Sequence, residues 1–435
     1  MSDTTRAELA HLLRRGAFAP TVAELDRAER LGYDRVVDAM LSMPPDPGAP
    51  ALPDLTAPPP AAKSDRAAAQ ARRVALHAQT RALQHWWLDR MTGTLDPALE
   101  RRTFFWHGHF AISVQKVQVA GYLAGQNQAF RGQGLGAFDA LTLAVTQGPA
   151  MLVWLDAADN VAAHPNENLG RELMELFTLG VGNYTETDVR EAARCLTGWS
   201  LNRRTGQFSV RAARHDQGRK TVLGVTGNMD GADLVHLLTR RPQSARWVTT
   251  RIWQRHVAPV PPGDRAVDAV ADSAARTPDG AVVLADLWRR VLLSAGFRDP
   301  AVRGALVAQP VEWAVGAMRQ LGLRARDHTA PLDRALTGLG QVLLEPPSVG
   351  GWPAGRAWLS TSAVLGRAVF AEQLAAVADL SQLADQAISS RVDAAAHLLA
   401  VAEWSPASRS ALDSVRSDPA RLMALALCSP EYVTR

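Results

Sequence analysis

Two short segments of this sequence concentrate side chains that could bind a metal ion or transfer protons. The first segment is PNENLGRELMELFTLG, at positions 165–180. When its residues are placed at steps of 100°, one side of the helix carries Glu167, Arg171, Glu172 and Glu175, and apolar side chains fill the other side. If this polar side faces a cavity, its three carboxylates and one guanidinium could hold a cation or orient one another for proton transfer.

The second segment, ERRTFFWHGHFAIS, places His107 and His109 two residues apart within a run of aromatic residues. In an extended chain the two imidazoles would point the same way and could chelate one ion. In an uninterrupted helix they would point about 200° apart, although Gly108 makes an interruption plausible. The aromatic surroundings favour the neutral imidazole, which is the form that binds metals.

Each segment also has a purely structural interpretation. The charged side of the 165–180 helix could be a solvated ladder of ion pairs at spacings of four residues, each contributing a few tenths of a kcal/mol. The two histidines could be core residues that donate hydrogen bonds to backbone carbonyls. A third polar group, HDQGRK, contains His215, Asp216 and Lys220 and is typical of a turn that could fold over a pocket.

The elements that would position these residues are mainly helical. Most segments show a helical period, and the clearest strand signal is a single β-hairpin between Gln207 and Val225, with its turn near Gly218. The predicted fold is therefore mainly α, with a small β-hairpin insertion in one large helical domain. A Pro-rich stretch at 44–62 predicts a semi-rigid linker between an N-terminal helical segment, 1–43, and the main helical domain, 63–435.

Composition limits the classes of function. The formal charge of +4 arises from 47 basic and 43 acidic residues, and the arginines are spread along the chain, which argues against a nucleic-acid groove. Cys195 and Cys428 cannot build a cysteine-based zinc site. We find neither an apolar run long enough to span a membrane nor a signal peptide, so the expected location is the cytoplasm.

Four stretches together resemble a known family. ERRTFFWHGHF, NENLGRELMELFTLGVGNYTETDVREAARCLTGW, HDQGRKTVLG and EPPSVGGWPAGRAWLSTSAVLGR are similar, in this order, to motifs of the bacterial family catalogued as domain of unknown function eighteen hundred. The resemblance spans nearly the whole chain. It implies a mainly helical fold and a partner that resembles alkaline phosphatases and is often exported, so that this chain could be exported together with it.

Matching the family motifs residue by residue points to a set of polar and aromatic side chains. These are Glu100, His107, His109, Asn166, Glu167, Asn168, Arg171, Glu172, Glu175, Thr178, His215, Lys220 and Trp352. The sequence departs from the family pattern at Gly170, where alanine is usual, and at Gly108, where asparagine is preferred. Glycine inside a helix costs about 1 kcal/mol relative to alanine, so Gly170 indicates either close packing or a less stable member.

Two hypotheses follow. The first is a metal-dependent enzyme, a hydrolase or an oxidoreductase. Its metal ligands would be His107, His109, Glu172 and Glu175, and its catalytic residues would be Glu167, Arg171, Glu172, Glu175, His215 and Lys220. Zinc, iron and manganese suit such mixed nitrogen and oxygen ligands about equally well. The second is a non-catalytic helical scaffold or chaperone that binds the alkaline-phosphatase-like partner, in which the charged helix only specifies the fold.

Overall fold

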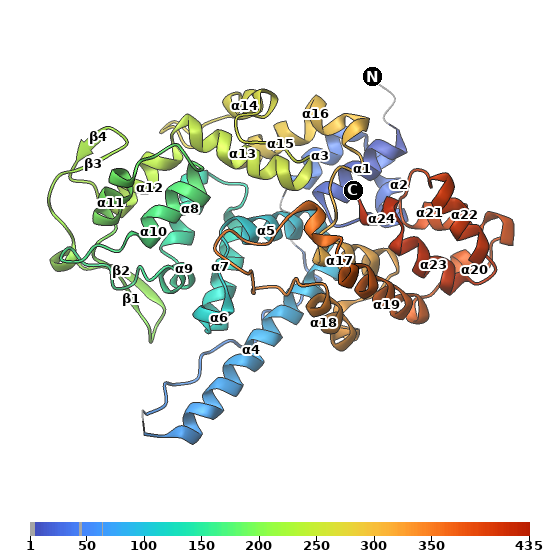
Figure 1. The fold of residues 1–435 in the computed structure, drawn as a ribbon, viewed down its shortest axis with the longest axis horizontal. Helices are drawn as coiled ribbons and strands as arrows, with labels where there is room; N and C mark the ends of the chain where they lie inside the picture. Colours follow the sequence, from blue (N-terminus) through green and yellow to red (C-terminus); the bar gives the residue numbers. More distant parts are fainter. Residues whose placement is uncertain (1–4, 43–45, 63) are drawn as a thin grey trace.

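The computed structural model describes residues 5–42, 46–62 and 64–435. The chain is mainly α-helical, with two small antiparallel sheets, which confirms the predicted fold class. Figure 1 shows the two sheets at one end of the molecule, the last helices of the chain at the other end, and α4 extending away from the body.

In chain order, the protein begins with a long run of helices and then enters the region that contains the strands. The first group comprises α1 (Arg6–Gly16), α2 (Val22–Leu31), α3 (Tyr33–Met40), α4 (Arg66–Gly93), α5 (Pro97–His109), α6 (Val114–Val117), α7 (Ala120–Gln133), α8 (Phe138–Thr146) and α9 (Pro149–Trp154). The second comprises α10 (Glu167–Glu172), the π-helix η1 (Leu173–Thr178), α11 (Glu186–Cys195), β1 (Trp199–Asn202), β2 (Gln207–Val210), η2 (Ala212–Arg214), β3 (Lys220–Val222) and β4 (Val225–Gly227).

The remaining elements are helical. They are α12 (Gly231–Thr239), α13 (Pro242–His256), α14 (Arg265–Asp272), α15 (Leu284–Leu293), α16 (Ala295–Arg298), η3 (Pro300–Val302), α17 (Pro310–Gln320), η4 (Ala325–Asp327), α18 (Thr329–Gly338), η5 (Gly355–Trp358), α19 (Thr361–Val377), α20 (Ser381–Ala384), η6 (Ile388–Ser390), α21 (Arg391–Leu398), α22 (Pro406–Val415), α23 (Pro419–Cys428) and α24 (Pro430–Val433). No helix in the described part of the chain is long and apolar enough to cross a membrane.

The predicted single hairpin is wrong in its pairing. Strand β2 pairs with the upstream strand β1, and β3 pairs with β4, so the region contains two hairpins. The turn between β3 and β4 consists of Leu223 and Gly224, both with positive φ, as a tight two-residue turn requires. Gly218, the predicted turn centre, instead lies in the connection between the hairpins, where its N–H donates to Asp216.

The N-terminal helices share the core of the rest of the chain. A continuous set of buried apolar side chains runs from Leu9 in α1 to Val433 in α24. The Pro-rich stretch runs alongside α4 in space. Trp86 Nε1 of this helix donates to the carbonyl of Pro50, and the Gln79 side chain donates to the carbonyl of Thr56. The stretch therefore connects two groups of helices that pack into one core; positions 1–4, 43–45 and 63 lie outside the described residues.

Helix α5 lies at the centre of this arrangement (Figure 1). Asp96 begins the helix by accepting a hydrogen bond from Leu99 N–H, and Pro97 occupies the first turn, where its missing N–H has no cost. Almost every side chain of α5 is buried, because α4, α7, α13 and α1 surround it. Polar residues on α5 must therefore find partners inside the protein.

Candidate functional site

The His-Gly-His segment is helical through His109, so Gly108 does not interrupt α5. Two residues along an α-helix turn the side chain by about 200°. As a result, His107 faces the segment around Leu344, whereas His109 faces η1. The two imidazoles lie on opposite sides of α5 and do not form a chelating pair.

His107 makes its contacts inside the fold. Its Nε2 accepts a hydrogen bond from the N–H of Leu344 at 3.3 Å, and its ring packs 5.2 Å from the rings of both Trp87 and Trp352. Burial lowers the pKa of His107 to about 3, so the ring is neutral at pH 7. Its observed role is to attach the 344–352 segment to the central helix.

His109 has one satisfied and one unsatisfied ring nitrogen. Nε2 lies 3.0 Å from the carbonyl oxygen of Phe177, and because a carbonyl can only accept, Nε2 carries the proton. Nδ1 is then an acceptor, and it is buried without a partner among the described residues. Burial, followed by the charge of Arg251, lowers the pKa of His109 to about 3.

His109 borders a small cavity that is partly open to solvent and has a volume of about 10 Å³, on the order of one water molecule. The cavity is lined by Arg101, Phe104, Phe105, Gly108, His109, Arg251, Arg255, Gln309 and Trp352. Three arginines line the same cavity as the imidazole, and none of these described lining residues is a carboxylate. Such surroundings favour an anion and oppose a divalent cation.

The π-helix η1 presents the carbonyl that holds His109. A π-helix bonds N–H to the carbonyl five residues earlier, as Leu179 N–H does with Met174, and such segments are often found at functional sites. The carbonyls at its end remain free for other donors: Phe177 accepts from His109, and Leu176 accepts from Trp247 Nε1 at 2.8 Å. The second half of the 165–180 motif thus positions His109 through backbone atoms.

The charged side of α10 faces α11. Arg171 donates to Glu167 at 3.1 Å and to both carboxylate oxygens of Glu186 at 2.8 Å. Tyr184 donates to Glu175 at 2.6 Å. The side chains of Glu167 and Arg171 are 41% and 34% exposed, so this is a partly solvated ion-pair network that joins two helices.

Glu172 is half-buried beside Glu175. Burial, and secondarily the charge of Glu175, raises the pKa of Glu172. Among the described residues, no group of three or more His, Cys, Asp or Glu side chains is arranged to hold a metal ion. The four predicted ligands His107, His109, Glu172 and Glu175 are therefore not brought together in the described part of the chain.

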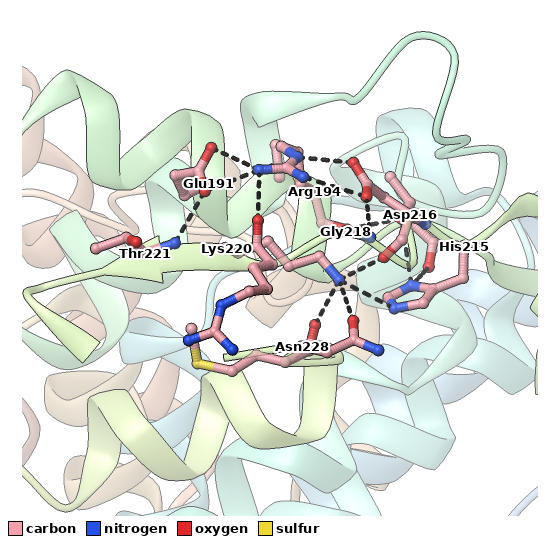
Figure 2. A network of polar contacts seen from close by, with 12 residues as sticks. Glu191, Arg194, His215, Asp216, Gly218, Lys220, Thr221 and Asn228 are labelled. Atoms are coloured by element: carbon pink, nitrogen blue, oxygen red, sulfur yellow. Dashed lines mark hydrogen bonds and ion pairs between the residues drawn. The ribbon is translucent and has the colours of Figure 1, made fainter. Parts of the chain in front are cut away.

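His215 and Lys220 form a separate network near the hairpins (Figure 2). His215 Nδ1 donates to the carbonyl of Thr197 at 2.8 Å, so its Nε2 can accept from the Lys220 ammonium at 3.3 Å. Lys220 is fully buried, and it also donates to Asn228 Oδ1 and to the carbonyl of Met229. All these contacts are internal, so the pair holds the hairpins together and does not line the cavity beside His109.

Asp216 extends the same network to α11. Arg194 binds Asp216 and Glu191, and the hydrogen bond from its guanidinium lowers the pKa of Asp216 to about 2. Glu191 in turn accepts from Thr221 N–H on β3 (Figure 2). The conspicuous polar cluster of the HDQGRK segment is therefore explained by the attachment of β3 to α11.

The arginines that line the cavity were not singled out from the sequence. Arg251 and Arg255 lie four residues apart in α13, on either side of Trp253 in the stretch RIWQR, and Arg101 lies two turns before His109. The available signal in the sequence is this pair of arginines at helical spacing beside a tryptophan, since a buried guanidinium needs a partner.

The fold and this cavity define a mainly helical protein with a buried, arginine-lined pocket at the end of its central helix. The chain belongs to the family described as Protein of unknown function (DUF1800), whose model matches residues 11–434. No curated protein and no solved structure matches the chain.

The two departures from the family pattern have different structural meanings. A Cβ added to Gly170 would lie 3.3 Å from both Ala192 Cβ and the backbone nitrogen of Ala193, so the glycine lets α10 approach α11 closely. At Gly108 an added Cβ would meet nothing within 4 Å, so a larger residue also fits there. Close packing therefore accounts for Gly170.

Proposed function

We propose that this protein is an enzyme whose reaction centre is the cavity beside His109. The observation that carries the proposal is the unpartnered Nδ1 of His109, buried at the wall of a cavity whose described lining offers no other acceptor side chain except Gln309. Leaving a buried acceptor unsatisfied costs about 1–3 kcal/mol, and a hydroxyl group or a water molecule in the cavity would offset that cost. Nδ1 would then take the proton of this group as a general base.

The surroundings of His109 support this role. The hydrogen bond to the Phe177 carbonyl fixes the tautomer and the ring orientation, as the orienting group of a catalytic histidine does. Burial, and secondarily the charge of Arg251, lowers the pKa of His109. A negatively charged substrate beside Arg251 would reduce that repulsion and bring the pKa of His109 closer to neutral pH, where a base is most effective.

His109→Gln should abolish turnover, whereas His107→Gln should not. A general base contributes about 10²- to 10⁴-fold to rate. His107 is an equally buried histidine on the same helix that does not line the cavity, so it is the matched control. The measurement is turnover of small anionic esters, lactones and hydroxy acids, first screened with the wild type and then repeated with both variants. Wild-type turnover that survives in His109→Gln to within twofold would exclude the role.

The metal-dependent form of the enzyme hypothesis gives a separate prediction. We expect purified protein to contain well below one zinc, iron or manganese ion per chain. The reason is that the imidazoles of His107 and His109 point to opposite sides of α5 and that three arginines line the cavity beside His109. Elemental analysis of the wild type, His107→Ala and His109→Ala tests this. One equivalent of metal in the wild type that is lost in both variants would restore the metal site.

The scaffold alternative is favoured by one specific feature, the exposed apolar side chains of α19. Val364, Leu365, Val369 and Val377 are 47–65% exposed on this helix. Such a stripe is suited to contact with another protein, and the family resemblance suggests an alkaline-phosphatase-like partner. Co-purification of that partner with the wild type but not with the double variant Leu365→Glu/Val369→Glu would support the scaffold hypothesis. The support would be stronger if His109→Gln left all cellular activity intact.

A further inference from the structure

We infer that a second cavity, adjoining the one beside His109, is a binding site for a small oxyanion such as a phosphate or carboxylate group. It lies where α1, α5, α13 and α17 meet, is partly open to solvent, and has a cavity volume of about 20 Å³, so a ligand larger than water needs its side chains to move apart. The two cavities share three wall residues, Arg101, Arg255 and Gln309. An anion held in one therefore lies next to the other.

The side chains of this second cavity carry a large excess of positive charge. Five arginines line it, and Glu312 is the one carboxylate among its described lining residues. The arginines are Arg14, Arg15, Arg101, Arg255 and Arg435. Arg15, Arg101 and Arg435 are at most 6% exposed, so their mutual repulsion is weakly screened, and an anion placed among them would be favoured.

Glu312 is already committed to other contacts. One of its oxygens binds the Arg101 guanidinium at 2.6 Å and the side-chain amide of Gln309 at 3.1 Å. The other accepts the backbone N–H of Gln309 at 3.0 Å and lies 4.0 Å from Arg435 Nη1. This single carboxylate therefore cannot neutralise the remaining guanidinium groups.

Several nitrogen donors at the cavity have no partner among the described residues. Arg15 Nε and Nη1 and Arg101 Nε are buried and unpaired, and both residues are only 2% exposed. Burial, the largest cause, lowers the pKa of Arg101 and of Arg255 to about 10, so both remain charged at neutral pH. Buried, charged donors without acceptors are rare in folded proteins, and an anionic ligand would supply the acceptors that these donors need.

The donors define the chemistry of that ligand. Guanidinium groups bind planar carboxylates and tetrahedral phosphates through paired N–H···O bonds, which an isolated chloride ion cannot reproduce. As a statement about the substrate, the inference rests on the proposed function: the anion would be the charged group of the molecule that His109 acts on. The anion site itself depends only on the arginines.

Binding of inorganic phosphate and of succinate tests the inference directly. We expect each ligand that fits to raise the thermal midpoint of the intact protein with saturation, at an ionic strength held constant with sodium chloride. Arg255→Gln should weaken binding at least about tenfold, since it removes one charged donor. Arg246→Gln is the matched control, because Arg246 lies on the same helix and pairs with Asp272 at the surface. A response to phosphate alone identifies a phosphate site, and a response to succinate alone identifies a carboxylate site.

The opposite change provides a second test if Arg255→Gln does not fold. Glu312→Gln removes the competing carboxylate and should tighten binding of the same anion. The inference fails if neither anion stabilises the wild type beyond sodium chloride, or if Arg255→Gln binds as tightly as Arg246→Gln. His109→Gln separates the two proposals, because it should bind phosphate or succinate within about twofold of the wild type while losing turnover.

Discussion

Lowering the pH from 7 to 5 should remove about 8 kcal/mol of stability, a large part of the total for a typical protein. Four histidines cause this effect: His11, His107, His109 and His256, all at most 8% exposed. Burial is the largest cause that lowers the pKa of His11 to about 3. Burial lowers the pKa of His107 and His109 to about 3 and that of His256 well below its usual value. These rings stay neutral in the folded protein while the unfolded chain takes up protons below about pH 6.5.

The sign follows from that difference. Stability is full above the unfolded pKa of about 6.5, and each histidine then contributes a loss of about 1.4 kcal/mol per pH unit as the pH falls towards 3. The measurement is the urea midpoint between pH 8 and 5. His107→Gln should reduce the slope by about a quarter, and His164→Gln, at an exposed position, should leave it unchanged. A urea midpoint that does not change with pH over this range would contradict the prediction that these histidines stay neutral in the folded protein.

Glu100→Ala should destabilise the protein by about 3–5 kcal/mol. Glu100 is completely buried on α5. Its carboxylate binds the guanidinium groups of Arg90 and Arg131 and accepts from Trp87 Nε1 at 3.0 Å. Burial alone would raise the pKa of Glu100, but the two arginines outweigh it and lower the pKa, so the group stays charged. Removing it leaves two guanidinium groups and an indole without their acceptor.

Glu167→Ala is the appropriate comparison for that experiment. Glu167 also pairs with an arginine, Arg171, but its side chain is 41% exposed, so we expect a loss of about 0.5 kcal/mol or less. Both variants are compared by urea unfolding at pH 7.5. Equal losses in the free energy of unfolding would mean that water reaches the Glu100 carboxylate, and that the centre of the helical core is more hydrated than its burial indicates.

The helical fold could be predicted from the sequence because helical periodicity is local. The two-faced character of positions 165–180 was predicted, and Asn166 does cap α10. The partner of each face was not predictable, because it depends on Glu186 and Tyr184 in the next part of the chain. The pairing of β2 with β1 was missed, since the strand pattern after Gln207 suggests a partner downstream.

The candidate site shows the same limit. His109 was selected from its spacing and aromatic surroundings, and it does border a cavity. The arginines that complete this cavity come from α5 and α13, those of the adjoining cavity come also from α1, and only the folded chain brings these helices together. Several residues of the family motifs, including Glu100, His107 and Lys220, serve internal contacts instead. The buried polar groups could therefore be predicted from the residue types in the sequence. Which of these groups remain free to bind a ligand could not.

The π-helix η1 makes the chain sensitive to length at one place. Its ladder accommodates one residue more per turn than an α-helix does, so deleting a single residue between Leu173 and Thr178 would allow an ordinary helix to form. The ordinary helix would absorb the deletion without turning the following chain, but it would rearrange the carbonyls at the end of η1 that now accept from His109 and Trp247. The backbone of η1, more than any particular side chain, thus fixes the orientation of the imidazole.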